Sequence, residues 1–255
     1  MYTIEGPDDI PHIPKDALPL GGGSNVIICP SIEAPLVRVS PQFCTIELRN
    51  GVVRCSAGLT VAGALKWMTA HGLSGLEFAA GVPATIGGMV YMNFGCWGTS
   101  MSDLVSAVLV HDHDKGARWI QSSEYQAGYR WTSFHDQPCI ILAVEFHATH
   151  ADSGTIKCQV KDNISRRKKS QPILKPTFGS VFKNPAKRKA WELVEACQLK
   201  GVSVGGAIVS PKHANFFENQ SHASVDDALA LIAHIQKTVF KMYNVQLECE
   251  VQIIQ

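Results

Sequence analysis

Ser180 is the residue of this chain whose surroundings most directly suggest chemistry. It lies in the stretch KPTFGSVFKNP (175–185), where Gly179 precedes it and the apolar Val181 and Phe182 follow it. A hydroxyl group in such a place has two possible uses. It is either a buried side chain whose hydrogen bonds the backbone satisfies, or a group that donates a proton to a substrate.

A cluster of glycines, LGGGSNVII (20–28), leads into a short apolar strand. Consecutive glycines let the backbone approach a phosphate closely, and their N–H groups can form an anion-binding nest. The cluster is not a dinucleotide fingerprint, because Val26 stands where the third glycine of GxGxxG belongs. It is not a P-loop either, because no GKS or GKT follows. A plain turn before the strand is the alternative.

A second stretch, AAGVPATIGGMVYMNFGCWG (79–98), is also rich in glycine. Each glycine inside a helix costs about 1 kcal/mol relative to alanine. We therefore expect backbone that lies against a flat or charged ligand, with Thr85 and the amide groups of Ile86 and Gly87 directed at it. A glycine-rich contact between two helices is the alternative. Two such loops in one half of the chain suggest a dinucleotide held outside a Rossmann fold.

The histidines and cysteines form no metal-binding pattern. His111 and His113 are expected in a solvated turn beside Asp112 and Asp114, and no HExxH or CxxC motif occurs. We therefore expect no metal site. The eight cysteines are scattered, and the sequence does not begin with a basic and apolar leader. These features indicate reduced thiols in a cytoplasmic protein.

The composition is typical of a globular protein. Of the 255 residues 45% are hydrophobic and 18% are charged, and the formal net charge is +1. This balance predicts neither a nucleic-acid partner nor attachment to a membrane surface. The one basic run, RRKK (166–169), indicates a solvated helix end, and no apolar run reaches the ~18 residues of a membrane span.

The first half of the chain indicates short strands separated by glycine turns. An Asn-Gly pair at 50–51 predicts a hairpin, and a second hairpin is expected with its turn at 112–116. Between them a helix is expected, with Thr60 as its N-cap and Gly72 at its end. The stretch CIILAVEFHA (139–148) predicts a buried strand.

From about Asp152 the pattern becomes helical. One helix is expected before Pro172, with Ile156, Val160 and Ile164 at helical spacing. The stretch KAWELVEACQL (189–199) predicts a second helix.

The most regular helix is expected to begin at Ser224, which forms a capping-box pattern with Asp227, and to end at Asn244. Its apolar stripe consists of Ile232, Ile235, Val239 and Met242. After it, VQLECEVQII (245–254) alternates apolar and polar residues, which predicts a strand. The chain is therefore expected to be an α+β protein with a strand-rich region at 1–150 and a helix-rich region at 151–255.

The motifs together resemble those of a known family. LGGGSN, GLEFAAGVPATIGG, YMNFGCWG, GYRWTSF, GSVFKNP, GGAIVSPKHANF and NVQLECEVQII are similar, in order and spacing, to the motifs of bacterial UDP-N-acetylenolpyruvoylglucosamine reductases. GSVFKNP and the final LExEV are specific to this family rather than to FAD proteins in general. The resemblance implies an FAD-binding region of the PCMH type at 1–150, made of two small subdomains, and an α+β substrate-binding domain at 151–255.

The resemblance also implies an enzyme with FAD and NADPH as cofactors. Such an enzyme reduces UDP-N-acetylglucosamine enolpyruvate to UDP-N-acetylmuramate, a step of peptidoglycan precursor synthesis on which cell wall biogenesis, cell shape and division depend. We expect a cytoplasmic monomer that binds this small-molecule substrate, no nucleic acid and no membrane. Its FAD is expected to be bound tightly and without a covalent link.

Carried over motif by motif, the resemblance assigns Ser180, Arg130 of GYRWTSF and Glu250 of LECEV to the reacting group. It places Asn184 and His213 near the substrate. It places FAD against the two glycine loops, at Gly21, Gly22, Gly23, Ser24, Asn25, Gly81, Val82, Thr85, Ile86, Gly87 and Gly88.

The chemistry of the reaction agrees with these roles. Hydride addition to an enolpyruvyl double bond leaves negative charge spread into the carboxylate, which a fixed guanidinium such as Arg130 is suited to stabilise. The other carbon then needs a proton, and the hydroxyl of Ser180 can deliver one. Glu250 can act as a second acid or as an orienting group. In the alternating pattern Glu248 shares its face, so only the motif selects Glu250.

Some positions depart from the family pattern. The family usually carries a further strand and a Gly-Gly loop before the segment equivalent to MYTIEG, so we expect weaker FAD binding here. Ala84 stands where glycine is common, and Thr132 stands where serine is common. Two alternatives stay open: another FAD oxidoreductase with a different substrate, and a flavin- or nucleotide-binding relative without turnover. The substrate-side motifs argue against the first, and the complete catalytic set argues against the second.

Overall fold

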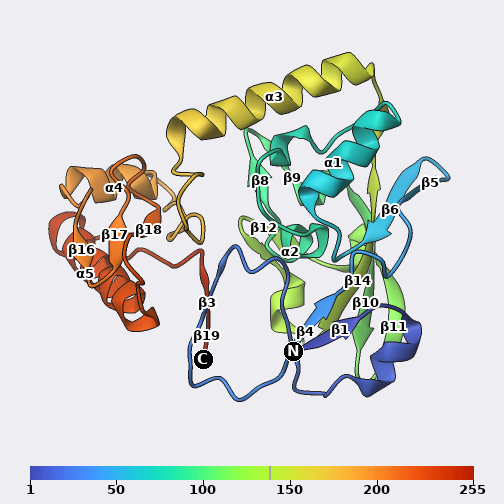
Figure 1. Ribbon diagram of the computed structural model, residues 1–255, viewed down its shortest axis with the longest axis horizontal. Coiled ribbons are helices and arrows are strands. Elements are labelled where there is room, and N and C mark those ends of the chain that lie inside the picture. Colours follow the sequence, from blue (N-terminus) through green and yellow to red (C-terminus); the bar gives the residue numbers. More distant parts are fainter. Residues whose placement is uncertain (138) are drawn as a thin grey trace. The chain divides into compact units, whose positions relative to one another are not determined.

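The computed structural model describes residues 1–137 and 139–255, and the chain divides into two units (Figure 1). The first unit consists of Met1–Gly22 and Ala34–Ser165, and the second of Gly23–Glu33 and Arg166–Gln255. This division differs from the boundary expected at residue 150, because helix α3 (Ser153–Ser170) begins just after that residue and contributes to both units. The pairing that draws 23–33 into the second unit joins distant segments and leaves no local signal in the sequence.

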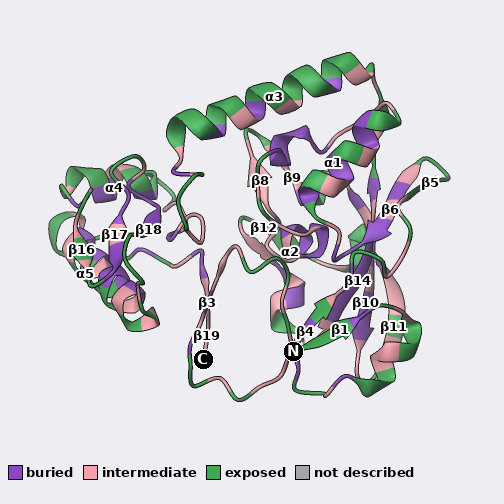
Figure 2. Cartoon of the chain, viewed as in Figure 1, coloured by how far each residue is buried: buried purple, intermediate pink, exposed green. Residues whose placement is uncertain are grey.

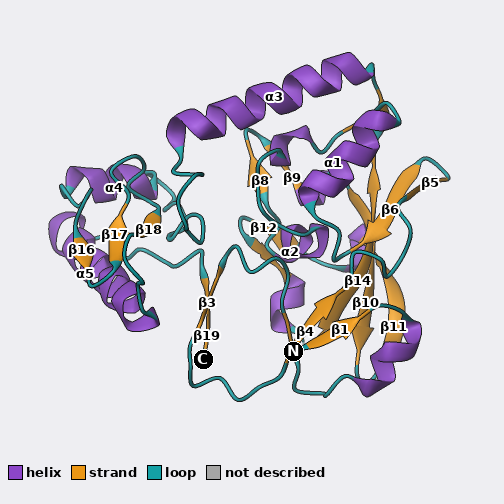
Figure 3. Ribbon diagram, viewed as in Figure 1, coloured by secondary structure: helices purple, strands orange, loops and turns teal. Residues whose placement is uncertain are grey.

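The first unit holds two main sheets (Figure 3). A parallel sheet has the order β1-β4-β2, with β1 (Tyr2–Ile4), β4 (Leu36–Val39) and β2 (Leu18–Pro19). An antiparallel sheet has the order β11-β10-β14-β6-β5, with β11 (Gly116–Gln121), β10 (Val105–Asp112), β14 (Cys139–His147), β6 (Val52–Ser56) and β5 (Glu47–Arg49). A second apolar cluster includes Ile4 and Val37 of the parallel sheet together with Ile140 and Leu142 of β14, so it joins the two sheets.

Shorter elements complete the first unit. The two-stranded pairs are β7 (Leu73–Ser74) with β15 (Thr149–His150), β8 (Gly95–Cys96) with β9 (Thr99–Ser100), and β12 (Ala127–Gly128) with β13 (Trp131–Thr132). The 3-10 helices are η1 (Pro7–His12), η2 (Glu77–Ala79), η3 (Met101–Asp103), η4 (Ser122–Glu124) and η5 (Ser133–Asp136).

The local predictions for the first unit are confirmed at both hairpins and at the first helix. Asn50 and Gly51 connect β5 to β6 with φ of 49° and 83°, the left-handed conformation that a two-residue hairpin turn requires. β10 pairs with β11 around 112–116. In α1 (Val61–Ala70) the Thr60 hydroxyl accepts a hydrogen bond from the Gly63 amide at 3.1 Å, and the helix ends before Gly72.

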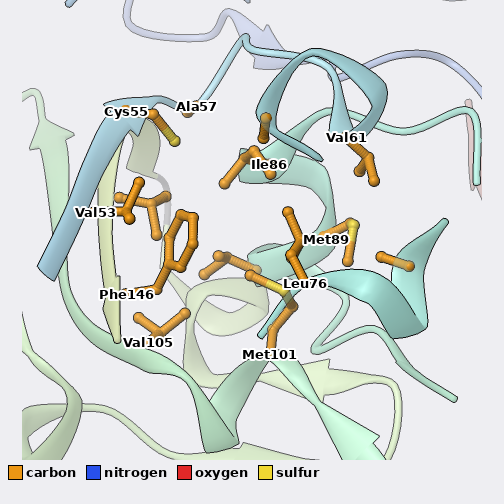
Figure 4. Packing of buried hydrophobic residues seen from close by; sticks show 14 of the residues in the cluster. Val53, Cys55, Ala57, Val61, Leu76, Ile86, Met89, Met101, Val105 and Phe146 are labelled. Atoms are coloured by element: carbon orange, nitrogen blue, oxygen red, sulfur yellow. The ribbon is translucent and has the colours of Figure 1, made fainter. Parts of the chain in front are cut away.

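The main apolar core of the first unit packs the five-stranded sheet against α1 and α2 (Ile86–Tyr91) (Figure 4). The strand β14 is buried along most of its length, as expected (Figure 2). Residues at the centre of this core are Val53, Cys55, Val61, Leu76, Ile86, Met89, Met101, Val105 and Phe146. Because this core fixes both α2 and the sheet, it also fixes the loops that connect them.

The solvated turn expected at His111 is wrong. His111 lies on β10, pairs with Ala117 and Ile140, and is only 8% exposed. Strand β10 continues through Asp112 and the turn begins at His113, so His111 is a strand residue in the interior. Burial is the main cause that lowers the pKa of His111, and the nearby His113 lowers it further.

The second unit contains two sheets and two helices of its own. The short parallel pair is β3 (Val26–Ile28) with β19 (Gln252–Ile254), and the antiparallel sheet is β16 (Ser203–Val204), β17 (Ala207–Val209) and β18 (Phe217–Asn219). The helices are α4 (Ala190–Ala196) and α5 (Val225–Tyr243). A separate apolar core joins α4 and α5 to these strands and includes Val181, Phe182, Leu193, Phe217, Leu231, Ile235 and Val251.

Helix α5 confirms its predicted ends. The Ser224 hydroxyl accepts from the Asp227 amide at 3.0 Å, the Asp227 carboxylate accepts from the Ser224 amide at 2.9 Å, and Asn244 ends the helix with φ of 51°. The predicted apolar stripe is buried except at Met242, which is 55% exposed. The prediction for Met242 is wrong because in the last turn Tyr243, and not Met242, packs against the core.

The strand expected over 245–254 is also wrong for most of its length. Only Gln252–Ile254 pairs as a strand, and Cys249 makes an isolated bridge to Phe182. Alternation of apolar and polar residues is typical of a strand, but a strand also needs a neighbour of matching length. Here β3 is three residues long, so it pairs with only the end of this segment.

Candidate active site

The two glycine loops meet within the first unit. A Cβ atom on Gly21 would lie 2.9 Å from Thr85 Oγ1, and one on Gly22 would lie 3.3 Å from the Pro83 carbonyl oxygen. Side chains at these two positions would push the loops apart. Within the described part of the chain, no hydrogen bond uses the amide groups of Gly21 and Gly22, and both residues are exposed. Exposed amides on a closely approachable backbone suit the diphosphate of a dinucleotide.

In the second glycine loop, the expectation that the Ile86 and Gly87 amides point at a ligand is wrong. The amide of Ile86 donates to Leu59 O at 2.9 Å and that of Gly87 donates to Ala57 O at 2.8 Å, so neither is directed at a ligand. A Cβ on Gly87 would lie 2.7 Å from the Cβ of Ala57. Gly87 is therefore explained by close packing of α2 on the residue that follows β6. Thr85 caps α2 by accepting from the Gly88 amide at 3.3 Å.

Other cofactor candidates are distributed between the units. Gly81, exposed and with φ of 83°, and Val82 follow η2 in the first unit. Gly23, Ser24 and Asn25 belong to the second unit. There the Asn25 side chain donates to Glu250 O at 3.2 Å, and Asn25 O accepts from the Gln252 amide at 3.0 Å. Asn25 thus holds the backbone at Glu250, a role that its place in a glycine loop did not suggest.

Arg130 occupies the turn between β12 and β13, with φ of 56°. Its Nη1 donates to Gly95 O at 3.0 Å, and its guanidinium carbon lies 5.2 Å from the ring centroids of both Phe94 and Tyr129. Cation–π contacts of this kind restrain a guanidinium without neutralising it. These contacts therefore fix the position of the positively charged guanidinium of Arg130.

Asn93 supports the turn that carries Arg130. It is 7% exposed, its side-chain amide donates to Gly128 O at 2.8 Å, and its side-chain oxygen accepts from the Ser102 amide at 2.9 Å. The sequence reasoning missed this residue, although it lies inside the motif YMNFGCWG. An asparagine among apolar residues and glycines was the available signal, because a buried amide group has to be hydrogen-bonded.

Ser180 lies in an extended segment of the second unit and pairs with Phe216 through an isolated bridge. The next residue, Val181, donates its amide to Asn215 O at 2.9 Å. Ser180 is half-buried, and its hydroxyl makes no hydrogen bond to any residue of 1–137 or 139–255. It is therefore not the backbone-satisfied serine of the first alternative.

Glu250 lies beside the same segment. Its amide donates to Val181 O at 2.8 Å, and the residue is 9% exposed. The side chain of Glu248 is 74% exposed and lies 3.7 Å from Lys183 Nζ. Of the two acids that shared a face in the alternating pattern, only Glu250 is buried, because the strand geometry that would give them one face is absent here.

His213 and Asn184 also lie in the second unit. His213 Nδ1 accepts from the Asn215 amide at 3.2 Å, so a neutral ring carries its hydrogen on Nε2. Burial lowers the pKa of His213, and the positive charge of Lys200 lowers it further, which favours that neutral ring. Asn184 Oδ1 accepts from the Ala190 amide at 3.0 Å, so Asn184 supports the start of α4.

The structure brings Ser180, Glu250 and His213 into one unit and places Arg130 in the other. Among the described residues, no group of three histidine, cysteine or acidic side chains could hold a metal ion. In that same part of the chain no helix has the length and apolar character to cross a membrane. All eight cysteines are free thiols.

Two domain families match the chain in the order of its motifs. Residues 15–118 match the FAD binding domain family. Residues 171–254 match the family described as UDP-N-acetylenolpyruvoylglucosamine reductase, C-terminal domain. The first match covers the glycine-loop region, and the second covers Ser180, His213 and Glu250.

Comparison over nearly the whole chain also finds proteins named UDP-N-acetylenolpyruvoylglucosamine reductase. UDP-N-acetylenolpyruvoylglucosamine reductase from Levilactobacillus brevis is 37% identical over 92% of this chain and 77% of its own length. That from Halalkalibacterium halodurans is 32% identical over 99% of this chain and 90% of its own length. The crystal structure of UDP-N-acetylenolpyruvylglucosamine reductase from Thermus caldophilus is similar with a TM-score of 0.87 and 29% identity, covering 99% of this chain and 91% of that one.

Proposed function

This chain belongs to the UDP-N-acetylenolpyruvoylglucosamine reductase family, and from that premise we propose how its residues divide the reaction. The chain is an FAD-containing oxidoreductase that reduces UDP-N-acetylglucosamine enolpyruvate in peptidoglycan precursor synthesis, with NADPH as the reductant. Bound FAD supplies hydride obtained from NADPH.

The strand-rich region at 1–150 holds FAD, and the region at 151–255 holds the UDP-sugar. The exposed amides of Gly21 and Gly22 support the first assignment, because they suit the diphosphate of the cofactor. The match of residues 15–118 to the FAD binding domain family also supports it. The remaining residues of the two loops contribute to FAD binding by giving the site its shape. They are Gly23, Ser24, Asn25, Gly81, Val82, Thr85, Ile86, Gly87 and Gly88.

Arg130 stabilises the negative charge that spreads into the substrate carboxylate when hydride reaches the enolpyruvyl group. Support comes from its contacts with Gly95 O and with two aromatic rings, which fix the guanidinium in advance. A charge held in place needs no reorganisation when the transition state forms, and such preorganised groups are among the largest contributions to catalysis.

Ser180 donates the proton that completes the reduction. Its O–H bond breaks and a C–H bond forms at the carbon that did not receive hydride, leaving the serine oxygen to be reprotonated. The observation that supports this assignment is that the Ser180 hydroxyl, in the motif GSVFKNP, has no hydrogen-bond partner among residues 1–137 and 139–255. A hydroxyl already donating to the backbone would be a poorer acid.

Glu250 orients the reacting group or returns a proton to Ser180. Its burial and its backbone bond to Val181 support a place next to that segment. His213 donates from Nε2 to an acceptor on the substrate, which the tautomer imposed by Asn215 supports. Asn184 contributes to the same substrate surface through its position in GSVFKNP.

We place the enzyme in the cytoplasm as a monomer. Eight free thiols support a reducing compartment, and the family resemblance supports the monomer. Analytical ultracentrifugation of the purified protein measures the oligomeric state directly.

The function is tested with the purified protein and its chromophore. We expect a yellow protein whose flavin absorbance is bleached by NADPH and restored by UDP-N-acetylglucosamine enolpyruvate. UDP-N-acetylglucosamine, which lacks the enolpyruvyl group, is the control and should restore nothing. Acid precipitation should release all the flavin. A protein that NADPH bleaches but the enolpyruvyl ether does not restore would be an FAD oxidoreductase for another substrate, and one that never bleaches would be a relative without turnover.

A further inference from the structure

We propose that Asn215 is the positioning residue for the proton-donating segment, and this inference rests on the function proposed for Ser180. Asn215 is 4% exposed and lies in the motif GGAIVSPKHANF. It carries no charge and has no part in the chemistry described above. Its contacts nevertheless reach the segment of Ser180 and the ring of His213 at the same time.

The side chain of Asn215 makes the backbone hydrogen bonds that a neighbouring strand would otherwise make. Its Oδ1 accepts from the Phe182 amide at 3.0 Å, and its Nδ2 donates to Phe182 O at 2.8 Å. Its own carbonyl accepts from the Val181 amide at 2.9 Å. Ser180 to Phe182 belongs to no regular strand and has only isolated bridges, so without Asn215 these buried backbone groups would be unpaired.

The opposite side of the segment is held by the residues around Glu250. The carbonyl of Val181 accepts from the Glu250 amide at 2.8 Å, and the Lys183 amide donates to Glu248 O at 2.8 Å. The extended segment is therefore fixed from two sides. Both backbone groups of the fully buried Phe182 are hydrogen-bonded to the side chain of Asn215.

Asn215 also sets the state of His213. Its backbone amide, which Asn215→Ala leaves in place, donates to His213 Nδ1 at 3.2 Å and so leaves the ring hydrogen on Nε2. One residue thus couples the position of the proposed proton donor to the tautomer of the proposed substrate ligand. A displacement of the donor of about 1 Å is enough to slow a reaction on the order of 100-fold.

The test measures the two half-reactions separately in the complete holoenzyme. Asn215→Ala is made alone and together with Ser180→Ala, and NADPH-dependent flavin bleaching and substrate-dependent recovery are followed by stopped flow. Asn163→Ala is the matched control, because Asn163 is also a buried amide, 7% exposed, that donates to Glu77 O at 2.9 Å in the first unit. Thermal unfolding is recorded for each variant as a readout independent of activity.

The expected result is selective damage. Asn215→Ala should slow recovery by about 10- to 100-fold and change bleaching by less than about twofold. In the Ser180→Ala background it should slow recovery by less than about threefold more, because two residues that act on one step are not additive. Asn163→Ala should lower the unfolding temperature without separating the half-reactions.

Other outcomes overturn the inference. Equal slowing of both half-reactions, full additivity with Ser180→Ala, or unchanged recovery would each leave Asn215 a structural residue only. If Ser180→Ala itself leaves recovery unchanged, the proposed function of Ser180 fails and this inference fails with it; if Ser180→Ala slows recovery and Asn215→Ala does not, this inference alone fails. Should Asn215→Ala not fold, Asn215→Asp keeps the acceptor for the Phe182 amide, removes the donor to Phe182 O, and is judged by the same criteria.

Discussion

The two units treat their candidate chemical groups in opposite ways. In the first unit, Arg130 is engaged by a carbonyl oxygen and two aromatic rings, and its turn is tied down by Asn93. In the second unit, the hydroxyl of Ser180 has no partner in the described part of the chain, although the backbone around it is held from two sides. One group is fixed by its own contacts, and the other is fixed only through its backbone.

The difference fits the roles that we propose for the two groups. A charge that stabilises developing negative charge works best when its direction is set before the reaction. A hydroxyl that gives up its hydrogen has to be available to the substrate and cannot be committed to a protein acceptor. The proposed roles of Arg130 and Ser180 therefore rest on the hydrogen bonds that each side chain makes or lacks and not on how deeply it is buried.

The strongest test of this comparison removes the available hydroxyl. Ser180→Ala should slow substrate reduction by about 100- to 10,000-fold, the range for a lost general acid, and leave NADPH reduction of the flavin nearly intact. Stopped-flow measurement of the two half-reactions checks this. Ser221→Ala, at an exposed serine of the same unit, is the control and should change neither. Equal loss in both half-reactions would return Ser180 to a structural role.

The second test loosens the fixed charge. Arg130→Lys keeps the positive charge but loses the planar fork that reaches Gly95 O and lies on the rings of Phe94 and Tyr129. Substrate reduction should slow by about 10- to 100-fold. This loss is smaller than the one expected for Ser180→Ala, because lysine keeps the positive charge. Single-turnover rates measure the effect, with Arg49→Lys on exposed β5 as the control. A rate within twofold of wild type would contradict preorganisation at this position.

The third test concerns the glycine loops of the first unit. Gly21→Ala introduces a Cβ 2.9 Å from Thr85 Oγ1, whereas Gly6→Ala introduces one with no atom within 4 Å. Overpacking costs about 1–3 kcal/mol, so we expect Gly21→Ala to weaken FAD binding several-fold and Gly6→Ala to leave it unchanged. Titration of flavin-depleted protein with FAD gives both dissociation constants. Identical constants would argue against the diphosphate assignment.

The smallest expected effect compares one buried histidine from each unit. Burial is the main cause that lowers the pKa of both His111 and His213 below the usual 6.5. The unfolded chain therefore binds more protons, so each histidine makes the folded state less stable as the pH falls below 6.5. His111→Gln and His213→Gln should each lose less stability than wild type between about pH 7 and pH 5.

Urea unfolding at the two pH values measures this difference. His234→Gln, at an exposed position of α5, is the control and should follow the wild-type curve. If only one of the two substitutions changes the dependence of the unfolding free energy on pH, burial does not control the titration of the other histidine.

Local chemistry was predictable from the sequence wherever neighbours in the chain determine it. The Asn-Gly turn at 50–51 and the Ser224 capping box need only adjacent residues, and both are confirmed. His111 was missed because strand β10 extends through Asp112, which makes His111 a buried strand residue and not part of an exposed turn.

The candidate site was predictable only as a set of residue names. The motif selected Glu250 over Glu248, but its burial depends on a backbone bond to Val181, which is far away in the sequence. The Ile86 and Gly87 amides were assigned to a ligand because their partners at Leu59 and Ala57 could not be foreseen. Asn93 and Asn215 were not assigned any role, since a buried amide that replaces a strand neighbour has no periodic pattern.

The pairing of β3 with β19 has a consequence for how the protein is synthesised. Asn25 and Glu250, which join these segments, are 225 residues apart. At ~5–20 residues per second a ribosome needs roughly 10 to 45 s to make that distance. Within the first unit, the five-stranded sheet and α1 can form during this interval. The second unit cannot complete its core until Gln252–Ile254 has been made, and until then Val26–Ile28 is an apolar segment without its strand partner. This segment is only three residues long, and long exposed strand edges are the ones that aggregate. We therefore expect little pairing of Val26–Ile28 with another chain during synthesis.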